Sequence, residues 1–131
     1  MPNNDFGVRS ESGANKVQIL ANVEMQASVG IRVSDAGVTA VNGKKIVKAG
    51  TPMAGDLADR LTAFTALKTA GTVTNVKGVL LHDVDVTLGA NNGTLLIFGF
   101  VNTSRLEDDI KALHVAALAT ALPMVKSFPA N

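Results

Sequence analysis

The chain has 131 residues, of which 47% are apolar and 18% carry a charge, a length that fits one domain with a hydrophobic core. Twelve basic and eleven acidic residues leave a net charge of +1, which argues against nucleic-acid binding, and the absence of cysteine excludes disulfides and thiolate metal sites. The charged fraction lies below the roughly 25% of an average domain. This favours a protein that hides part of its surface in an assembly over a compact monomer rich in Ala and Gly.

Residues 1–15 are rich in Asn, Ser and Gly and show no apolar periodicity. Such a segment buries too little apolar surface to offset the entropy of ordering it, so we expect a mobile N-terminal arm. The arm has no apolar stretch of the kind that a secretion signal needs, and no run in the chain approaches the length of a membrane span. We therefore expect a soluble protein that is made in the cytoplasm and does not contact a membrane.

The first part of the remaining chain has the period of half-buried strands. Polar residues alternate there with β-branched ones, which are Val17, Ile19, Val29, Ile31 and Val33. Asn42-Gly43 predicts a tight hairpin turn between residues 38–41 and 45–48. The second of these strands is expected to end before Pro52, because proline has no amide proton to give to a sheet.

Residues 56–68 allow two interpretations. Four apolar residues share one helical face, and Asp56 suits the N-cap of a short helix. These four are Leu57, Leu61, Phe64 and Leu67. The threonines at positions 62, 65 and 69 favour the competing interpretation, an extended loop.

Two apolar runs, residues 79–86 and 94–101, are each too short for a typical helix. The linker between them, residues 88–93, is rich in Gly and Asn, which tolerate positive φ angles. We expect the runs to form an antiparallel hairpin at the centre of a rigid β scaffold. Gly99 inside the second run predicts a bulge or a close backbone approach.

A helix is expected over residues 104–122. Ser104 and Glu107 have the spacing of a capping box, and Pro123 ends the helical pattern. Two apolar stripes run along this helix, which leaves open whether it packs on its own sheet or on a neighbouring subunit. Residues 124–128 then form a candidate final strand.

The sequence offers no convergent set of catalytic or metal-binding residues. In a strand, Asp83 and Asp85 share one face while His82 points to the other, so these three side chains do not form a metal site. We interpret them as a strand end that turns polar. His114 is expected on the helix surface or at an interface, and no serine stands in a nucleophile-elbow motif. We expect no enzymatic activity, no cofactor and no metal.

Three phrases resemble small head decoration proteins of tailed bacteriophages. They are Ile46-Val-Lys-Ala-Gly-Thr-Pro52, Lys77-Gly-Val-Leu-Leu-His-Asp-Val-Asp-Val-Thr87 and Leu96-Ile-Phe-Gly-Phe-Val-Asn102. Their order is that of the family, and the resemblance covers residues 44–105, just under half of the chain. It implies a structural virion protein on the capsid exterior, often a trimer, that stabilises the expanded head against the pressure of the DNA. The implied partners are the major capsid protein and further copies of the chain.

The expected fold is therefore mainly β with a C-terminal helix (α+β), as a small β-barrel or β-tulip-like module over residues 16–131. We expect the arm, residues 1–15, to add a strand to an exposed capsid edge. Ordering about ten residues costs on the order of 10–20 kcal/mol, so several arms presented by one oligomer are needed. The candidate capsid-binding residues are Asn3, Asn4, Asp5, Phe6, Val8 and Arg9.

Two rival functions remain open. One is a small-ligand-binding or enzymatic β-barrel, with His82, Asp83 and Asp85 lining its mouth. The other is a different virion component, such as a β protein of the tail or the connector. The first rival predicts an activity or a metal affinity that is lost in the variant His82→Ala.

Overall fold

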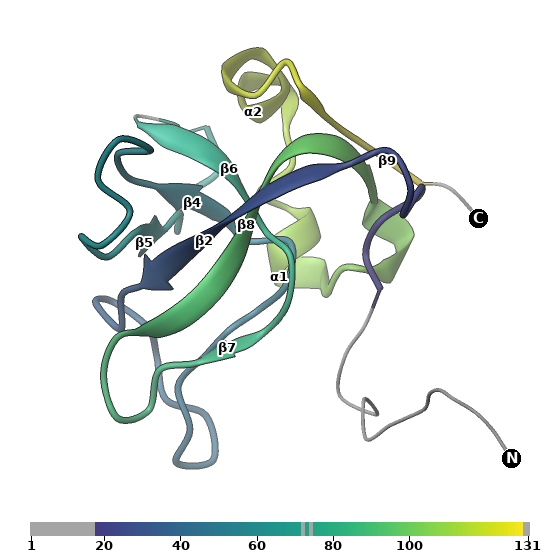
Figure 1. Cartoon of the computed structure of the whole chain (residues 1–131). Helices are drawn as coiled ribbons and strands as arrows, with labels where there is room; N and C mark the ends of the chain where they lie inside the picture. Colours follow the sequence, from purple (N-terminus) through teal and green to yellow (C-terminus); the bar gives the residue numbers. More distant parts are fainter. Residues whose placement is uncertain (1–17, 72, 74, 130–131) are drawn as a thin grey trace, which may run out of the picture.

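The computed structural model describes residues 18–71, 73 and 75–129 (Figure 1). Its strands are β2 (Ala27–Val33), β3 (Ile46–Val47), β4 (Pro52–Ala54), β5 (Thr65–Ala66), β6 (Val76–Leu80), β7 (Val84–Asp85), β8 (Asn91–Asn102) and β9 (Val125–Phe128). Its helical elements are the 3₁₀ helix η2 (Thr103–Arg105) and the α-helices α1 (Asp108–Lys111) and α2 (Ala116–Ala121). The expected mainly β, α+β fold is confirmed. The expected arm, residues 1–15, lies outside the described residues.

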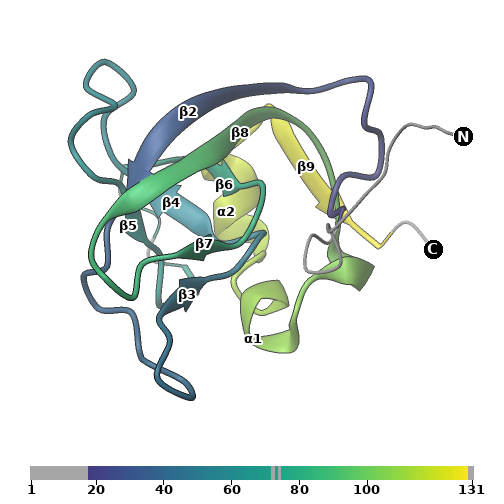
Figure 2. The same ribbon diagram turned by 60° about the horizontal axis from the view of Figure 1, so that its bottom comes forward.

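The long strand β8 organises the main sheet, whose strand order is β2-β8-β6-β4-β5. Strand β2 runs antiparallel to β8, and β6 pairs with the middle of β8 through Val79–Leu96 and Leu80–Leu95. Beyond β6, the last part of β8 pairs in parallel with β9 (Figure 2). The expected final strand at residues 124–128 is therefore confirmed as β9.

The two ends of the main sheet approach each other at one isolated bridge between Val33 and Phe64. The amide of Phe64 donates to the carbonyl of Arg32 at 2.7 Å, and the amide of Ser34 donates to the carbonyl of Phe64 at 2.8 Å. The sheet is therefore strongly curled, although no closed barrel is found among the described residues.

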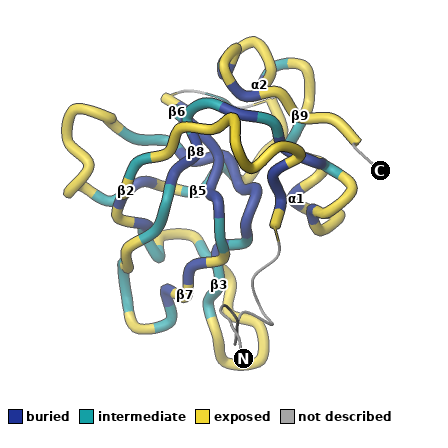
Figure 3. Tube along the Cα trace, turned by 45° about the vertical axis from the view of Figure 1, so that its right-hand side comes forward, coloured by how far each residue is buried: buried dark blue, intermediate teal, exposed yellow. Residues whose placement is uncertain are grey.

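Two clusters of buried side chains form the core, and Figure 3 shows the buried residues gathered along the middle of the molecule. One cluster lies within the curl of the sheet: Ile31, Val33, Val47, Met53, Phe64, Leu80, Val84, Val86 and Leu95. The other joins the sheet to the C-terminal segments and includes Ile19, Val79, Leu96, Val101, Ile110, Leu118 and Val125. Adjacent residues of β8 thus point into different clusters, as the two faces of a strand require.

The expected alternation in the first strand is confirmed over β2, where Ile31 and Val33 are buried and Arg32 is exposed. The Asn42-Gly43 turn is also confirmed. Both residues have positive φ, 54° and 79°, which is the requirement of a type I′ hairpin turn. Its flanking pairing is limited to the bridge between Val41 and Lys44.

The expected central hairpin is confirmed only in part. Strands β6 and β8 are antiparallel neighbours, but residues 79–86 do not form one strand. Strand β6 ends at Leu80, and β7 pairs instead with β3 in a separate two-stranded sheet. The carboxylate of Asp83 accepts the amide of Ala49 at 2.7 Å, which holds the chain toward β3 at this point.

Gly99 has the unusual geometry that its position predicts. Its φ is +152°, and the register between β2 and β8 shifts beside it, where Ala27 faces Phe98 and Ser28 faces Leu96. A Cβ at Gly99 would come within 3.4 Å of the Met25 carbonyl oxygen. The bulge is therefore present, while the distance to the Met25 backbone is an ordinary van der Waals contact.

The helix interpretation of residues 56–68 is wrong, and the extended interpretation is right. The segment consists of turns followed by β5, and its apolar residues do not share one face. Phe64 is completely buried, whereas Leu61 is 87% exposed. The backbone hydrogen bonds of Phe64 to the end of β2 require an extended chain, and this tertiary pairing overrides the helical pattern.

A continuous helix over residues 104–122 is also wrong, because the segment is divided into η2, α1 and α2. The capping box does not form. Instead the side chain of Asn102 accepts the amide of Ser104 at 3.0 Å, and Glu107 makes no side-chain cap hydrogen bond. The break lets Ile110 in α1 and Leu118 in α2 both reach the same core cluster. These pieces therefore pack within the chain's own fold.

Candidate functional site

In the cluster of His82, Asp83 and Asp85, the two carboxylates accept hydrogen bonds that hold the local backbone. Asp83 accepts the Ala49 amide, while Asp85 accepts both the amide and the hydroxyl of Thr87, at 2.9 and 2.6 Å. The hydrogen bonds from Thr87, chiefly that of its hydroxyl, lower the pKa of Asp85. Within the described residues, no group of three His, Asp or Glu side chains has metal-binding geometry. These contacts agree with a polar strand end.

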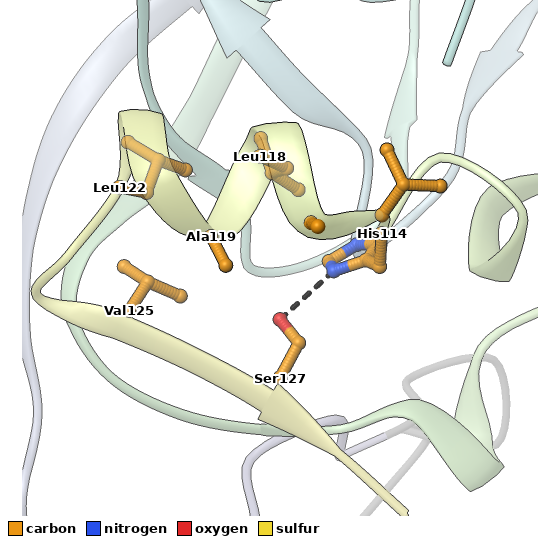
Figure 4. Close-up of a pocket in the computed structure, with 8 residues that line it drawn as sticks. His114, Leu118, Ala119, Leu122, Val125 and Ser127 are labelled. Atoms are coloured by element: carbon orange, nitrogen blue, oxygen red, sulfur yellow. Dashed lines mark hydrogen bonds between the residues drawn. The ribbon is translucent and has the colours of Figure 1, made fainter. Parts of the chain in front are cut away.

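His114 lies at the junction between α1 and α2 and connects two distant parts of the chain. Its Nε2 lies 2.7 Å from the carbonyl oxygen of Gly50, and its Nδ1 lies 2.8 Å from the hydroxyl of Ser127 on β9 (Figure 4). A carbonyl only accepts, so Nε2 carries the proton and Nδ1 accepts from Ser127. Burial lowers the pKa of His114 and favours this neutral form.

A pocket of about 240 Å³ adjoins His114. Its other lining residues are Val115, Ala116, Leu118, Ala119, Leu122, Val125 and Ser127. Figure 4 shows the imidazole and the Ser127 hydroxyl facing each other across one side of this pocket. The imidazole is oriented by a backbone carbonyl, where a catalytic Ser-His pair uses a carboxylate. His114 thus joins the α1–α2 junction, the turn at Gly50 and β9 at the point where the expected helix is interrupted.

The three phrases quoted above, which are separated in the sequence, meet in the structure. The amide of Gly50 donates to the carbonyl of Leu80 at 2.7 Å, and the amide of Leu80 donates to the carbonyl of Thr51 at 2.9 Å. Strand β6 pairs in turn with β8 through Val79 and Leu96. The first phrase also pairs with the end of the second through β3 and β7. The three phrases are thus neighbours in the fold, although β3 and β7 form a sheet of their own.

The two ends of the described chain lie at the same end of β8 (Figures 1 and 2). On one side of β8, the amide of Asn102 donates to the carbonyl of Ile19 at 2.7 Å; on the other, Asn102 faces Phe128 of β9. The guanidinium of Arg105 donates to the carbonyl of Gln18 at 2.8 Å. The point at which residues 1–17 join the domain is therefore well anchored.

The candidate capsid-binding residues lie outside the described residues, and no contact can be assigned to them. They are Asn3, Asn4, Asp5, Phe6, Val8 and Arg9. No helix in the described part of the chain has both the length and the apolar character that a membrane span requires.

Comparison with models of known protein families and with curated proteins finds no significant match for this chain. Proposals about its function therefore depend on its own residues and on their arrangement.

Proposed function

We propose that the protein is a structural component of a bacteriophage virion. In this proposal it binds the outer surface of the expanded head, contacts the major capsid protein and stabilises the shell as a trimer. The observation that carries the proposal is the meeting of the three decoration-protein-like phrases: the first contacts the second through β3 and β7 and through Leu80, and the second contacts the third through β6 and β8. A resemblance that was scattered along the sequence becomes one contiguous structural unit.

The curl of the sheet supports a β-tulip-like module. Its ends are joined by the backbone hydrogen bonds of Phe64, and its interior is filled by large apolar side chains. Close packing of this kind gives low compressibility, which suits a protein that has to resist strain in a pressurised shell. The polar residues that the sequence singled out hold turns in place, and this use of Asp83 and Asp85 fits a role without chemistry.

The anchoring of Gln18 supports the role of the arm. An arm transmits force to a capsid only if its attachment point is fixed, and here Gln18 is held by Arg105 beside the end of β8. Exposed apolar side chains occur in the segments that flank this end: Val23, Met25, Met124 and Phe128. Apolar surface of this kind suits contact with another subunit or with the capsid.

The proposal is tested by mixing the purified protein with expanded, DNA-filled heads that lack it. We expect saturable binding in a fixed ratio to the capsid protein, with little binding to unexpanded precursor shells. A variant that lacks residues 1–15 should bind at least tenfold more weakly. Binding of this variant as tight as that of the full chain would refute the arm mechanism, and failure of the full chain to bind would refute the proposed function.

Two experiments distinguish this proposal from its rivals, a different virion component and a ligand-binding or enzymatic β-barrel. Antibody labelling of intact virions should mark the head, whereas a tail or connector protein would be marked elsewhere. For a ligand-binding β-barrel, titration with divalent metals should reveal an affinity that His82→Ala abolishes. In the structure Asp83 and Asp85 accept hydrogen bonds from the chain itself, which gives this rival no support.

A further inference from the structure

An open groove lies on the outside of the main sheet, away from the ends of the chain. It is bounded by the exposed face of β2, by the start of β8 and by the loop of residues 57–61. The residues that matter here are Gly30, Arg32, Arg60, Leu61 and Asn92. None of the contacts described above for the three phrases or for His114 uses this surface.

Two arginine side chains border the groove, and both keep unused hydrogen-bond donors. Arg60 donates to the carbonyl of Gly30 at 3.2 Å, and Arg32 donates to the carbonyl of Ala90 at 3.3 Å. Each guanidinium has five N–H donors. Among the described residues, the one ion pair joins Lys48 and Glu107, so neither arginine is neutralised by a carboxylate within the fold.

The one acidic residue that lines the groove is already engaged. The carboxylate of Asp59 accepts the hydroxyl of Thr62 at 2.7 Å. That hydrogen bond leaves the negative charge of Asp59 in place, so two positive side chains face one negative one and the groove stays positive by one charge. The planar forks of Arg32 and Arg60 keep N–H donors for a carboxylate that arrives from another molecule. Leu61, 87% exposed, adds an apolar contact at the rim.

Gly30 is an unexpected residue in the middle of β2. Its φ is not in the positive region, its pairing with Thr94 is regular, and a Cβ at this position would meet nothing within 4 Å. Neither the backbone nor the packing of this chain thus requires glycine. A glycine inside a strand weakens it, and such glycines mark bulges, tight bends of a curled sheet, or sites that a ligand or another backbone approaches closely. Gly30 lies outside the bulge of β2 and borders the groove, so the close-approach interpretation is the one tested below.

We infer that this groove binds an extended, carboxylate-bearing segment of the major capsid protein. The choice of this partner rests on the function proposed above. The backbone of that segment passes over Gly30, its carboxylate accepts from Arg32 and Arg60, and an apolar side chain packs on Leu61. This contact is separate from the arm: the groove adjoins the start of β8, while Gln18 lies near the end of that strand.

The arm and the groove are close enough together to contact the same capsid surface. The segment of β8 from Gly93 to Asn102 spans roughly 30 Å at the rise of a strand. A chain of the length of residues 1–17 spans at most roughly 60 Å. One capsid surface is therefore within reach of both the arm and the groove.

The test measures binding of full-length variants to expanded heads. Gly30→Val adds a side chain to the groove at a position where a Cβ would meet nothing within 4 Å, and valine is favourable in a strand. Arg32→Gln/Arg60→Gln removes both charges. We expect each variant to bind at least tenfold more weakly, with an unchanged or raised melting temperature for Gly30→Val.

Two controls isolate the groove. Ser28→Val introduces the same side chain on the same exposed face of β2 but outside the groove, and Lys44→Gln/Lys111→Gln removes two positive charges elsewhere. Both controls should bind within twofold of the wild type.

Each outcome has one meaning. If the wild type does not bind heads, the proposed function and this inference are both wrong. If the wild type binds and the groove variants bind equally well, only the inference is wrong. If the groove variants lose head binding because they no longer form the trimer in solution, the groove belongs to a neighbouring copy and the capsid contact is refuted.

Discussion

The imidazole of His114 donates through Nε2 to the backbone carbonyl of Gly50 at 2.7 Å, which links the α1–α2 junction to the turn between β3 and β4. Gly50 is buried, and its amide donates in turn to Leu80 of β6. One side chain thus connects the C-terminal segments to the centre of the sheet. Its loss leaves a buried carbonyl without this donor.

Stability should fall as the pH falls below about 6.5. Burial lowers the pKa of His114 from its ordinary value of 6.5, so near that pH the unfolded chain binds a proton that the folded chain does not. The free energy of unfolding therefore rises with pH through this window and levels off above it. Urea unfolding between pH 5 and 8 measures the effect.

The variant His114→Ala separates this residue from all other titrating groups. We expect a loss of about 1–3 kcal/mol at pH 7.5, because the Gly50 carbonyl loses its partner. The remaining pH dependence between pH 5 and 7 should be visibly flatter than that of the wild type. An unchanged slope would mean that His114 does not control it.

Gly50→Ala should destabilise the fold by about 2–5 kcal/mol. Gly50 has a φ of +92°, and an added Cβ would collide with the side chain of Leu106. Gly43→Ala is the matched control, because Gly43 also has a positive φ but open space around it. Its cost should be only about 1–2 kcal/mol. Chemical denaturation of both variants gives the comparison, and equal losses would contradict the packing argument.

Phe64→Ala should cost about 3–5 kcal/mol, whereas Leu61→Ala should change stability by less than about 0.5 kcal/mol. Phe64 is completely buried and Leu61 is largely exposed, although a helix over residues 56–68 would place both on one face. Thermal and urea unfolding test the pair directly. Similar costs for the two substitutions would favour the helical alternative.

The ion pair between Lys48 and Glu107 should contribute less than about 1 kcal/mol, although its atoms lie only 2.6 Å apart. Both side chains are substantially exposed, at 36% and 60%, so water and salt screen their attraction. The hydrogen bond to Glu107 raises the pKa of Lys48 above 10.5, so the contribution persists below that pH and is lost as the pH rises through the raised value.

A double-mutant cycle with Lys48→Gln and Glu107→Gln measures this coupling. The coupling energy should decrease when the salt concentration is raised from 0.05 to about 1 M, because the Debye length then falls to roughly 3 Å. A coupling that is large and independent of salt would show that the pair is less solvated than its exposure indicates.

The local sequence pattern was sufficient to predict several elements of the fold. The alternation around Ile31 and Val33 and the Asn42-Gly43 turn depend on residues close together in the chain. Gly99 indicated the bulge through its tolerance of positive φ, although the bulge itself forms where β8 pairs with β2. Side-chain period and tolerance of positive φ are properties of such short segments.

Which segments of the chain pair with one another could not be predicted from the same local patterns. Periodicity shows which face of a segment is apolar, but not which distant segment will cover it. Val84 pairs with Val47 of β3, and Phe64 is held extended by the end of β2. In both cases long-range backbone pairing outweighs a local preference worth only tenths of a kcal/mol per residue.

The amino-acid sequence by itself determined that this is a mainly β chain whose apolar runs lie inside. Tertiary structure alone decided that the expected C-terminal helix breaks at His114 and that the groove beside Gly30 holds two arginines that form no ion pair among the described residues. The physical reason is the same for both features. Each depends on segments that are far apart in the sequence, which only the packed core holds together.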